Sequence, residues 1–104
     1  MNTPRIESLL KLLPSQPDDP FLRYALGIEF ANEGNDSGAE EYFRGVFEKF
    51  PTYVPNYLHY GMLLERQEQI DRAREIYLLG IKAADVAGDL HAKSELTGAL
   101  EMLV

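Results

Sequence analysis

A chain of 104 residues with a net charge of −7 is sized for a single acidic domain spanning residues 1–104. Clustered Lys and Arg are needed to bind a phosphate backbone, so this acidic balance argues against a nucleic-acid partner. The absence of cysteine excludes disulfides and thiolate metal sites, and no apolar run approaches the ~20 residues of a membrane span. We therefore expect a soluble, cytoplasmic protein with no membrane partner.

The first expected element is a helix over residues 4–13. Thr3 is a favourable N-cap, Pro4 suits the first helical turn, and Pro14 ends the helix. Its apolar residues recur at the spacing of one helical face: Ile6, Leu9, Leu10 and Leu13. This pattern predicts an amphipathic helix that covers the apolar flank of the segment that follows.

Residues 20–51 contain two further helices that are expected to form one hairpin. The carboxylate of Asp19 is placed to cap the first helix, and Gly34 supplies the left-handed residue that commonly stops one. Either Asn35 or Asp36 then caps the second helix, which a proline closes.

A second hairpin is expected over residues 54–87. The position of Gly34 is taken here by Glu68, so this hairpin lacks its turn glycine. Its second helix also lacks the closing proline and is expected to continue until Gly88 stops it. A last helix over residues 89–103 keeps one apolar stripe but loses the repeat pattern, which is typical of a capping helix.

The two hairpins match each other at a period of 34 residues. When Leu26–Gly27 is placed over Tyr60–Gly61, most positions keep their size class. The further matches are Phe30 with Leu64, Ala39 with Ala73, Phe43 with Tyr77, Val46 with Gly80 and Phe47 with Ile81. At the same period the first helix of the chain matches the second helix of a hairpin, so we interpret it as a half-repeat.

The period and the motifs Leu26-Gly27-x-x-Phe30 and Ala39-x-x-x-Phe43 are similar to those of the tetratricopeptide repeat (TPR) family. The resemblance implies an all-α fold, a right-handed superhelix of antiparallel helix pairs with about six helices. It also implies an adaptor or scaffold that binds a peptide or protein segment in a concave face lined by the first helices. The family's usual aromatic residue is replaced by Arg23 in the first repeat, a departure that does not move the register.

The sizes of the repeated residues indicate their packing roles. We expect Gly27 and Gly61 to let the partner helix approach closely. We expect large residues such as Phe30 and Phe43 to fill the space between the paired helices.

Mapping the first helices onto the concave face gives a candidate partner groove. Its residues are Phe21, Tyr24, Ile28, Asn32, Leu58, Met62 and Glu65. Each first helix carries a second apolar stripe beside its core stripe, which indicates either a binding face or burial on both sides. In the second case the stripe packs against the chain's own terminal helices. The Lys and Asn residues with which some family members grip a terminal carboxylate are absent, so that ligand is not expected.

The run Ile76–Ile81 holds more apolar residues than one helical face accommodates, so Leu78 or Leu79 must leave the core. We expect these side chains to pack under the last helix. The alternative is a homodimer contact, in which case the chain is a homo-oligomerising structural module with no separate ligand.

No catalytic, cofactor-binding or metal-binding residue is expected. His59 and His91 each lack the second histidine at i+4 that a helical zinc pair needs. No phosphate-binding glycine loop and no nucleophile motif appears in the sequence. We therefore expect a protein-binding module and not an enzyme.

Overall fold

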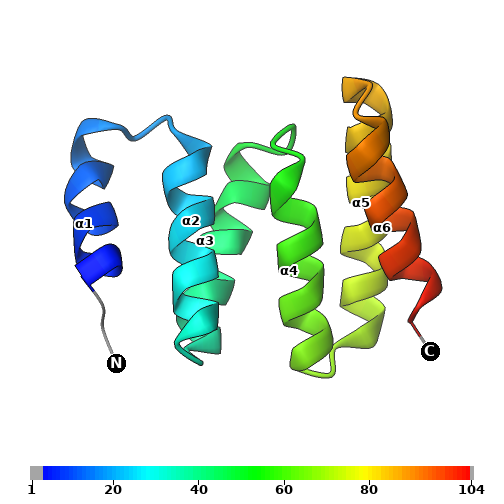
Figure 1. Ribbon diagram of the computed structural model, residues 1–104, viewed down its shortest axis with the longest axis horizontal. Helices are drawn as coiled ribbons and strands as arrows, with labels where there is room; N and C mark the ends of the chain where they lie inside the picture. The colour runs from blue at the N-terminus through cyan, green and yellow to red at the C-terminus, as the bar shows by residue number, and fades with distance from the viewer. Residues whose placement is uncertain (1–3, 104) are drawn as a thin grey trace. The chain divides into compact units, whose positions relative to one another are not determined.

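The computed structural model describes residues 4–103, and every regular element in that range is helical. The elements are α1 (Pro4–Leu12), a 3-10 turn (Leu13–Ser15), α2 (Pro20–Asn32), α3 (Asp36–Lys49), α4 (Pro55–Arg66), α5 (Ile70–Ala87) and α6 (Leu90–Glu101) (Figure 1). The expected all-α fold, with six α-helices among these residues, is confirmed. The chain divides into two compact units, the first ending at Phe50 and the second beginning at Pro51.

The first unit consists of the hairpin α2–α3 with α1 packed against α2. Ile6 is the buried residue of α1, and the Nε atom of Arg5 lies 2.9 Å from Oε2 of Glu29 on α2. The expected helix over residues 4–13 ends at Leu12, because Pro14 lies in a tighter 3-10 turn. The predicted cap at Thr3 lies outside the described residues.

Two side-chain caps define the hairpin of the first unit. Oδ1 of Asp19 accepts a hydrogen bond of 2.9 Å from the backbone N–H of Phe21. Oδ1 of Asn35 accepts one of 3.0 Å from the N–H of Gly38, so Asn35 and not Asp36 caps α3. Both caps satisfy donors that a helix start leaves without an intrahelical partner.

The turns inside the two hairpins share one backbone conformation. Gly34 adopts φ of +82°, and Glu68 adopts φ of +61° one period later. A left-handed conformation costs about 1 kcal/mol for a residue with a Cβ atom. The second turn therefore keeps the geometry of the first without its glycine. Gly88 closes α5 with φ of +73°, as the sequence predicted.

Each hairpin contains the same close contact between its two helices, at positions one period apart. The ring of Phe43 lies over Gly27, and the ring of Tyr77 lies over Gly61. These glycines were expected to let the partner helix approach closely. The structure agrees, because an aromatic ring of the partner helix fills the space that a Cβ atom would take at each glycine. Phe30, which was expected to fill the space between the paired helices, is half-buried on α2 and stacks on Tyr42 of α3 at a centroid distance of 5.6 Å.

The second unit adds α6 to the hairpin α4–α5, and α6 packs against both helices. Gly80 marks their meeting point, because a Cβ atom added there would lie 2.5 Å from Cβ of Tyr57 and 3.1 Å from Cδ1 of Leu96. Leu96 is the buried anchor of α6. Within residues 4–103, no helix has the length and apolar character that crossing a bilayer demands.

Candidate protein-binding surface

The expected groove residues of the first unit lie together on one side of α2. Tyr24 and Ile28 are half-buried, whereas Phe21 and Asn32 are exposed. The rings of Phe21 and Tyr24 contact each other in a tilted arrangement with centroids 6.4 Å apart. These four residues form the α2 patch, whose apolar part is not buried within the chain.

The expected groove residues of the second unit lie on α4 and differ in their surroundings. Met62 is exposed and Leu58 is half-buried, so this part resembles the α2 patch. Glu65 is half-buried and accepts a hydrogen bond from the hydroxyl of Tyr77. We name Leu58, Met62 and Glu65 the α4 patch. Its apolar part is open to solvent, whereas its carboxylate is tied to the core of the same unit.

The second unit holds two buried hydroxyls where the first unit has hydrocarbon, and each hydroxyl has a charged partner. Tyr60 and Tyr77 replace Leu26 and Phe43 of the first repeat. The hydroxyl of Tyr60 accepts a hydrogen bond of 2.8 Å from Nη2 of Arg72, and that of Tyr77 donates to Glu65. Burial, followed by the hydrogen bond to Glu65, raises the pKa of Tyr77 well above its ordinary value.

The charged partners of these hydroxyls occur in the second repeat and not at the equivalent positions of the first. One period earlier, the positions of Glu65 and Arg72 hold Ala31 and Gly38, which have no polar side chain. A buried hydroxyl without a hydrogen-bond partner costs about 1–3 kcal/mol. Each tyrosine hydroxyl therefore needs the charged residue that bonds it, and the first repeat has neither. Glu65 therefore has a structural role whether or not a partner protein also contacts it.

The loop before each hairpin is fastened by the same kind of hydrogen bond. Nη1 of Arg23 donates to the carbonyl oxygen of Pro17 at 2.7 Å. One period later, the hydroxyl of Tyr57 donates to the carbonyl oxygen of Pro51 at 2.6 Å. Arg23 therefore supplies the donor that an aromatic hydroxyl supplies in the second repeat.

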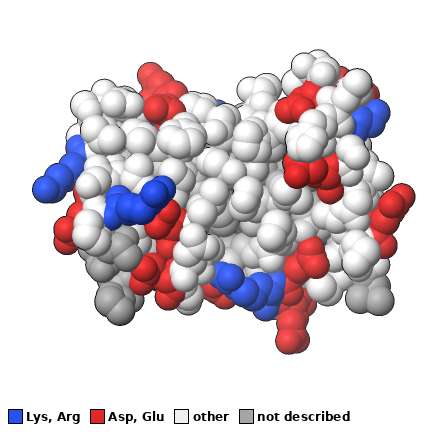
Figure 2. Space-filling model, viewed as in Figure 1, with Lys and Arg blue, Asp and Glu red and all other residues white. Residues whose placement is uncertain are grey.

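The charged side chains leave part of α4 clear. Figure 2 shows the surface over α4 as largely uncharged, with Lys or Arg atoms gathered at its lower end in that view. The last turn of α4 carries the basic residue Arg66. A surface of this kind favours contacts made by apolar side chains.

The two histidines lie in ordinary helical surroundings. Nδ1 of His59 lies 3.5 Å from the carbonyl oxygen of Pro55, one helical turn away. Nε2 of His91 lies 3.5 Å from Oε1 of Glu95 on the exposed side of α6. Within residues 4–103, no group of three or more His, Cys, Asp or Glu side chains is arranged to hold a metal ion.

A second apolar surface lies on α5 and was not expected to be open. Leu78 and Leu79 are 52% and 39% exposed, so the prediction that they pack under the last helix is wrong. Leu96 of α6 packs instead near Gly80, on another side of α5. A groove of about 360 Å³ borders Leu79; its lining residues are Pro51, Thr52, Tyr57, Leu79, Lys82, Ala83, Val86 and Ala87.

The sequence contained a signal for this groove. Leu79, Ala83, Val86 and Ala87 recur at i, i+4, i+7 and i+8, the spacing of one helical face. We expected the last helix to cover the surplus apolar residues, because periodicity alone does not tell which apolar face has a covering element.

Known proteins resemble the chain over most of its length. A tetratricopeptide repeat domain protein of Salinibacter ruber is 40% identical; its solution structure has a TM-score of 0.77 over 81% of this chain and 85% of that one. The crystal structure of the same protein has a TM-score of 0.76 over 80% of this chain and 92% of that one. A TPR repeat-containing protein of Pseudomonas aeruginosa is 29% identical over 94% of this chain and 93% of its own length.

A protein of Bordetella parapertussis has the same fold. It is 28% identical, with a TM-score of 0.79 over 97% of this chain and 87% of its own. No family model matches the sequence.

Proposed function

Because the chain belongs to the tetratricopeptide repeat family, whose domains generally mediate protein interactions, we propose that it is an adaptor for a protein partner. The partner segment binds the α2 patch and the α4 patch, on the first-helix face that the family resemblance implies to be concave. Repeats of this family are typically non-catalytic, and the proposal includes no chemical step, cofactor or metal.

One observation carries this proposal: large apolar side chains stay open to solvent on the first helix of both repeats. Phe21 is 53% exposed and Met62 is 52% exposed. Tyr24 and Ile28 are followed one period later by Leu58 and Met62, so both patches use the same helical positions. Apolar side chains that are half-buried or exposed at repeated positions, with the exposed Phe21 beside them on α2, favour a common ligand, because a single exposed residue needs no explanation.

The chemistry of the patches favours a segment with apolar anchor side chains. Phe21 offers a ring surface, and the flexible thioether of Met62 adapts to irregular shapes. The net charge of −7 favours a neutral or basic segment over an acidic one. Tyr24, Ile28, Leu58 and Met62 occupy the positions at which some family members hold a terminal carboxylate with Lys and Asn, so recognition does not depend on a free carboxyl terminus.

The test uses peptides selected against the wild-type chain from a random display library. We expect the double variant Phe21→Ser/Met62→Ser to bind the selected peptides at least about tenfold more weakly, because buried aromatic anchors dominate such interfaces. Fluorescence polarisation gives the dissociation constants. The variant Tyr24→Ser, whose site is half-buried, then reports whether the inner part of the α2 patch contributes.

A matched control is available at the two ends of α6, where Leu90 is the first helical residue and Met102 the C-cap. Leu90→Ser/Met102→Ser removes side chains of similar size that are also exposed, and its affinity for the same peptides should equal that of the wild type. Equal binding by both double variants would refute the proposed surface. Loss of helical circular dichroism in Phe21→Ser/Met62→Ser would place the patches in the core and refute it as well. A pull-down from the native host with the same two variants then identifies the natural partner.

A further inference from the structure

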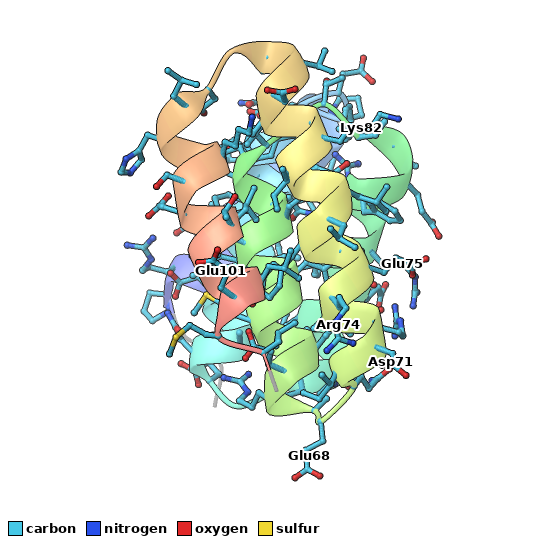
Figure 3. The ribbon with its side chains drawn as sticks, turned by 90° about the vertical axis from the view of Figure 1, so that its right-hand side faces the viewer. Glu68, Asp71, Arg74, Glu75, Lys82 and Glu101 are labelled. Carbon is cyan, nitrogen blue, oxygen red and sulfur yellow. The ribbon has the colours of Figure 1, made fainter. Side chains whose placement is uncertain are left out.

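The outward side of α5 carries an apolar pair between two opposite charges. Glu75, Leu78, Leu79 and Lys82 are all exposed, and we name them the α5 face. Val86, 82% exposed, lies one turn beyond Lys82. Figure 3 shows Glu75 and Lys82 projecting from the same side of α5, two turns apart, while the labelled Glu101 lies on α6.

The two charges of the α5 face are too far apart to neutralise each other. Seven residues separate them, which corresponds to about 10 Å along the helix axis. Helical ion pairs form at separations of three or four residues, such as that between Asp71 and Arg74 at 3.2 Å. Neither Glu75 nor Lys82 forms an ion pair with any residue in the range 4–103.

This order of charges is self-complementary. In an antiparallel pair of identical helices centred between Leu78 and Leu79, each Glu75 lies opposite the Lys82 of the other helix. We propose that the α5 face binds a second copy of this chain, forming a two-fold dimer through antiparallel α5 helices. A parallel arrangement would place Glu75 against Glu75 and is disfavoured by the same charges.

The two parts of the α5 face have different effects. Leu78 and Leu79 supply the apolar area that leaves water, which is the main favourable term in association. Exposed ion pairs contribute less than about 1 kcal/mol each, so the Glu75–Lys82 pairs chiefly fix orientation and register. The groove of about 360 Å³ beside Leu79 continues the apolar surface towards Thr52 and Tyr57.

This inference goes beyond the proposed adaptor function. The α5 face shares no residue with the α2 patch or the α4 patch. A dimer therefore doubles the number of partner sites and uses none of the residues assigned to them. Failure of the dimer leaves the adaptor function standing, and the reverse also holds.

Charge reversal tests the arrangement directly. We expect sedimentation equilibrium of the full chain to show a monomer–dimer equilibrium. Glu75→Lys places lysine at both ends of the α5 face and Lys82→Glu places glutamate at both ends, so two attractions become two repulsions in each homodimer. Each single variant should dimerise at least about tenfold more weakly.

Two combinations restore the pairing. The double variant Glu75→Lys/Lys82→Glu should dimerise within about threefold of the wild type, because small differences of this order are expected for surface pairs. An equimolar mixture of the two single variants should form a heterodimer, since every pair across the interface is then lysine with glutamate. The control Glu48→Lys reverses an exposed charge on α3 and should leave the dimer unchanged.

Several results would overturn the proposal. The proposal is overturned if the wild-type chain remains monomeric up to about 1 mM, because a dissociation constant of that size corresponds to only about 4 kcal/mol of binding free energy. A dimer that survives both single reversals uses another surface. If the mixture of single variants stays monomeric although each is folded by circular dichroism, the antiparallel register is wrong.

Discussion

Gly27 and Gly61 show how a single missing side chain decides the spacing inside a hairpin. A methyl group added to Gly27 would place its carbon 2.5 Å from Cε1 of Phe43, well inside van der Waals contact. In α3, by contrast, a Cβ atom on Gly45 would meet no atom within 4 Å. The same substitution therefore has opposite consequences at two helical glycines of one hairpin.

We expect Gly27→Ala to lower the free energy of unfolding by about 1–3 kcal/mol, because overpacking displaces the ring of Phe43. Gly45→Ala should raise it by about 0.5–1 kcal/mol, because alanine favours the helix more than glycine does. Urea unfolding followed by circular dichroism measures both. A stabilising Gly27→Ala would mean that the ring does not need the space.

The turns of the two hairpins place different residues at the same left-handed position and so permit a comparison at the level of the element. Gly34 and Glu68 both occupy the left-handed region, between a first helix and a second helix. The N–H of the residue after each turn position reaches back into the first helix: Asn35 to Phe30 O at 2.9 Å and Gln69 to Leu64 O at 2.8 Å. These bonds fix the turn whichever residue occupies it.

We expect Glu68→Gly to raise the free energy of unfolding by about 1 kcal/mol, because glycine adopts this conformation without a Cβ clash. The reverse change Gly34→Glu should lower it by a similar amount. Chemical denaturation of the two variants against the wild type provides the measurement. Equal stability of all three chains would show that the turn geometry carries no strain.

Most elements could be predicted from the sequence because their signals are local. The caps at Asp19 and Asn35 and the stop at Gly88 depend on a few neighbouring residues, and the structure agrees with them. One packing assignment failed because it depends on what covers a face. Leu78 and Leu79 were expected to lie under the last helix, but both are exposed.

The candidate partner surface was predictable only in part. The repeat places Tyr24 and Ile28 at the same helical positions as Leu58 and Met62, so their common role follows from the sequence. The hydrogen bond that ties Glu65 to Tyr77 does not, because it joins two helices whose side chains face each other only after folding. The partner groove itself remains a prediction.

At the scale of the whole molecule, the protonation of tyrosines in both units is coupled to folding. Burial raises the pKa of Tyr42 in the first unit and of Tyr57 and Tyr77 in the second. Their ordinary pKa is about 10, so these hydroxyls ionise first in the unfolded chain. The stability that they contribute is fully present below about pH 10 and is lost as the pH rises further.

We expect the free energy of unfolding to fall above about pH 10, by about 1.4 kcal/mol per pH unit for each tyrosine that ionises only when unfolded. Tyr77→Phe should weaken this pH dependence, since Phe43 shows that a phenyl ring fits the equivalent site. Urea titrations between neutral and strongly alkaline pH measure the slopes. Every other residue is the same in both chains, so the difference isolates Tyr77. Identical slopes would mean that its ionisation is not linked to folding.

The paired bonds from Arg23 to Pro17 and from Tyr57 to Pro51 bear on how such arrays are recognised and built. A scoring scheme that compares residue types counts Arg23 as a mismatch with Tyr57. Both side chains nevertheless donate to the proline carbonyl at the equivalent position of their repeat. A designer who lengthens the array by another hairpin needs a long side chain ending in a proton donor at this position, and the choice between guanidinium and phenol is open.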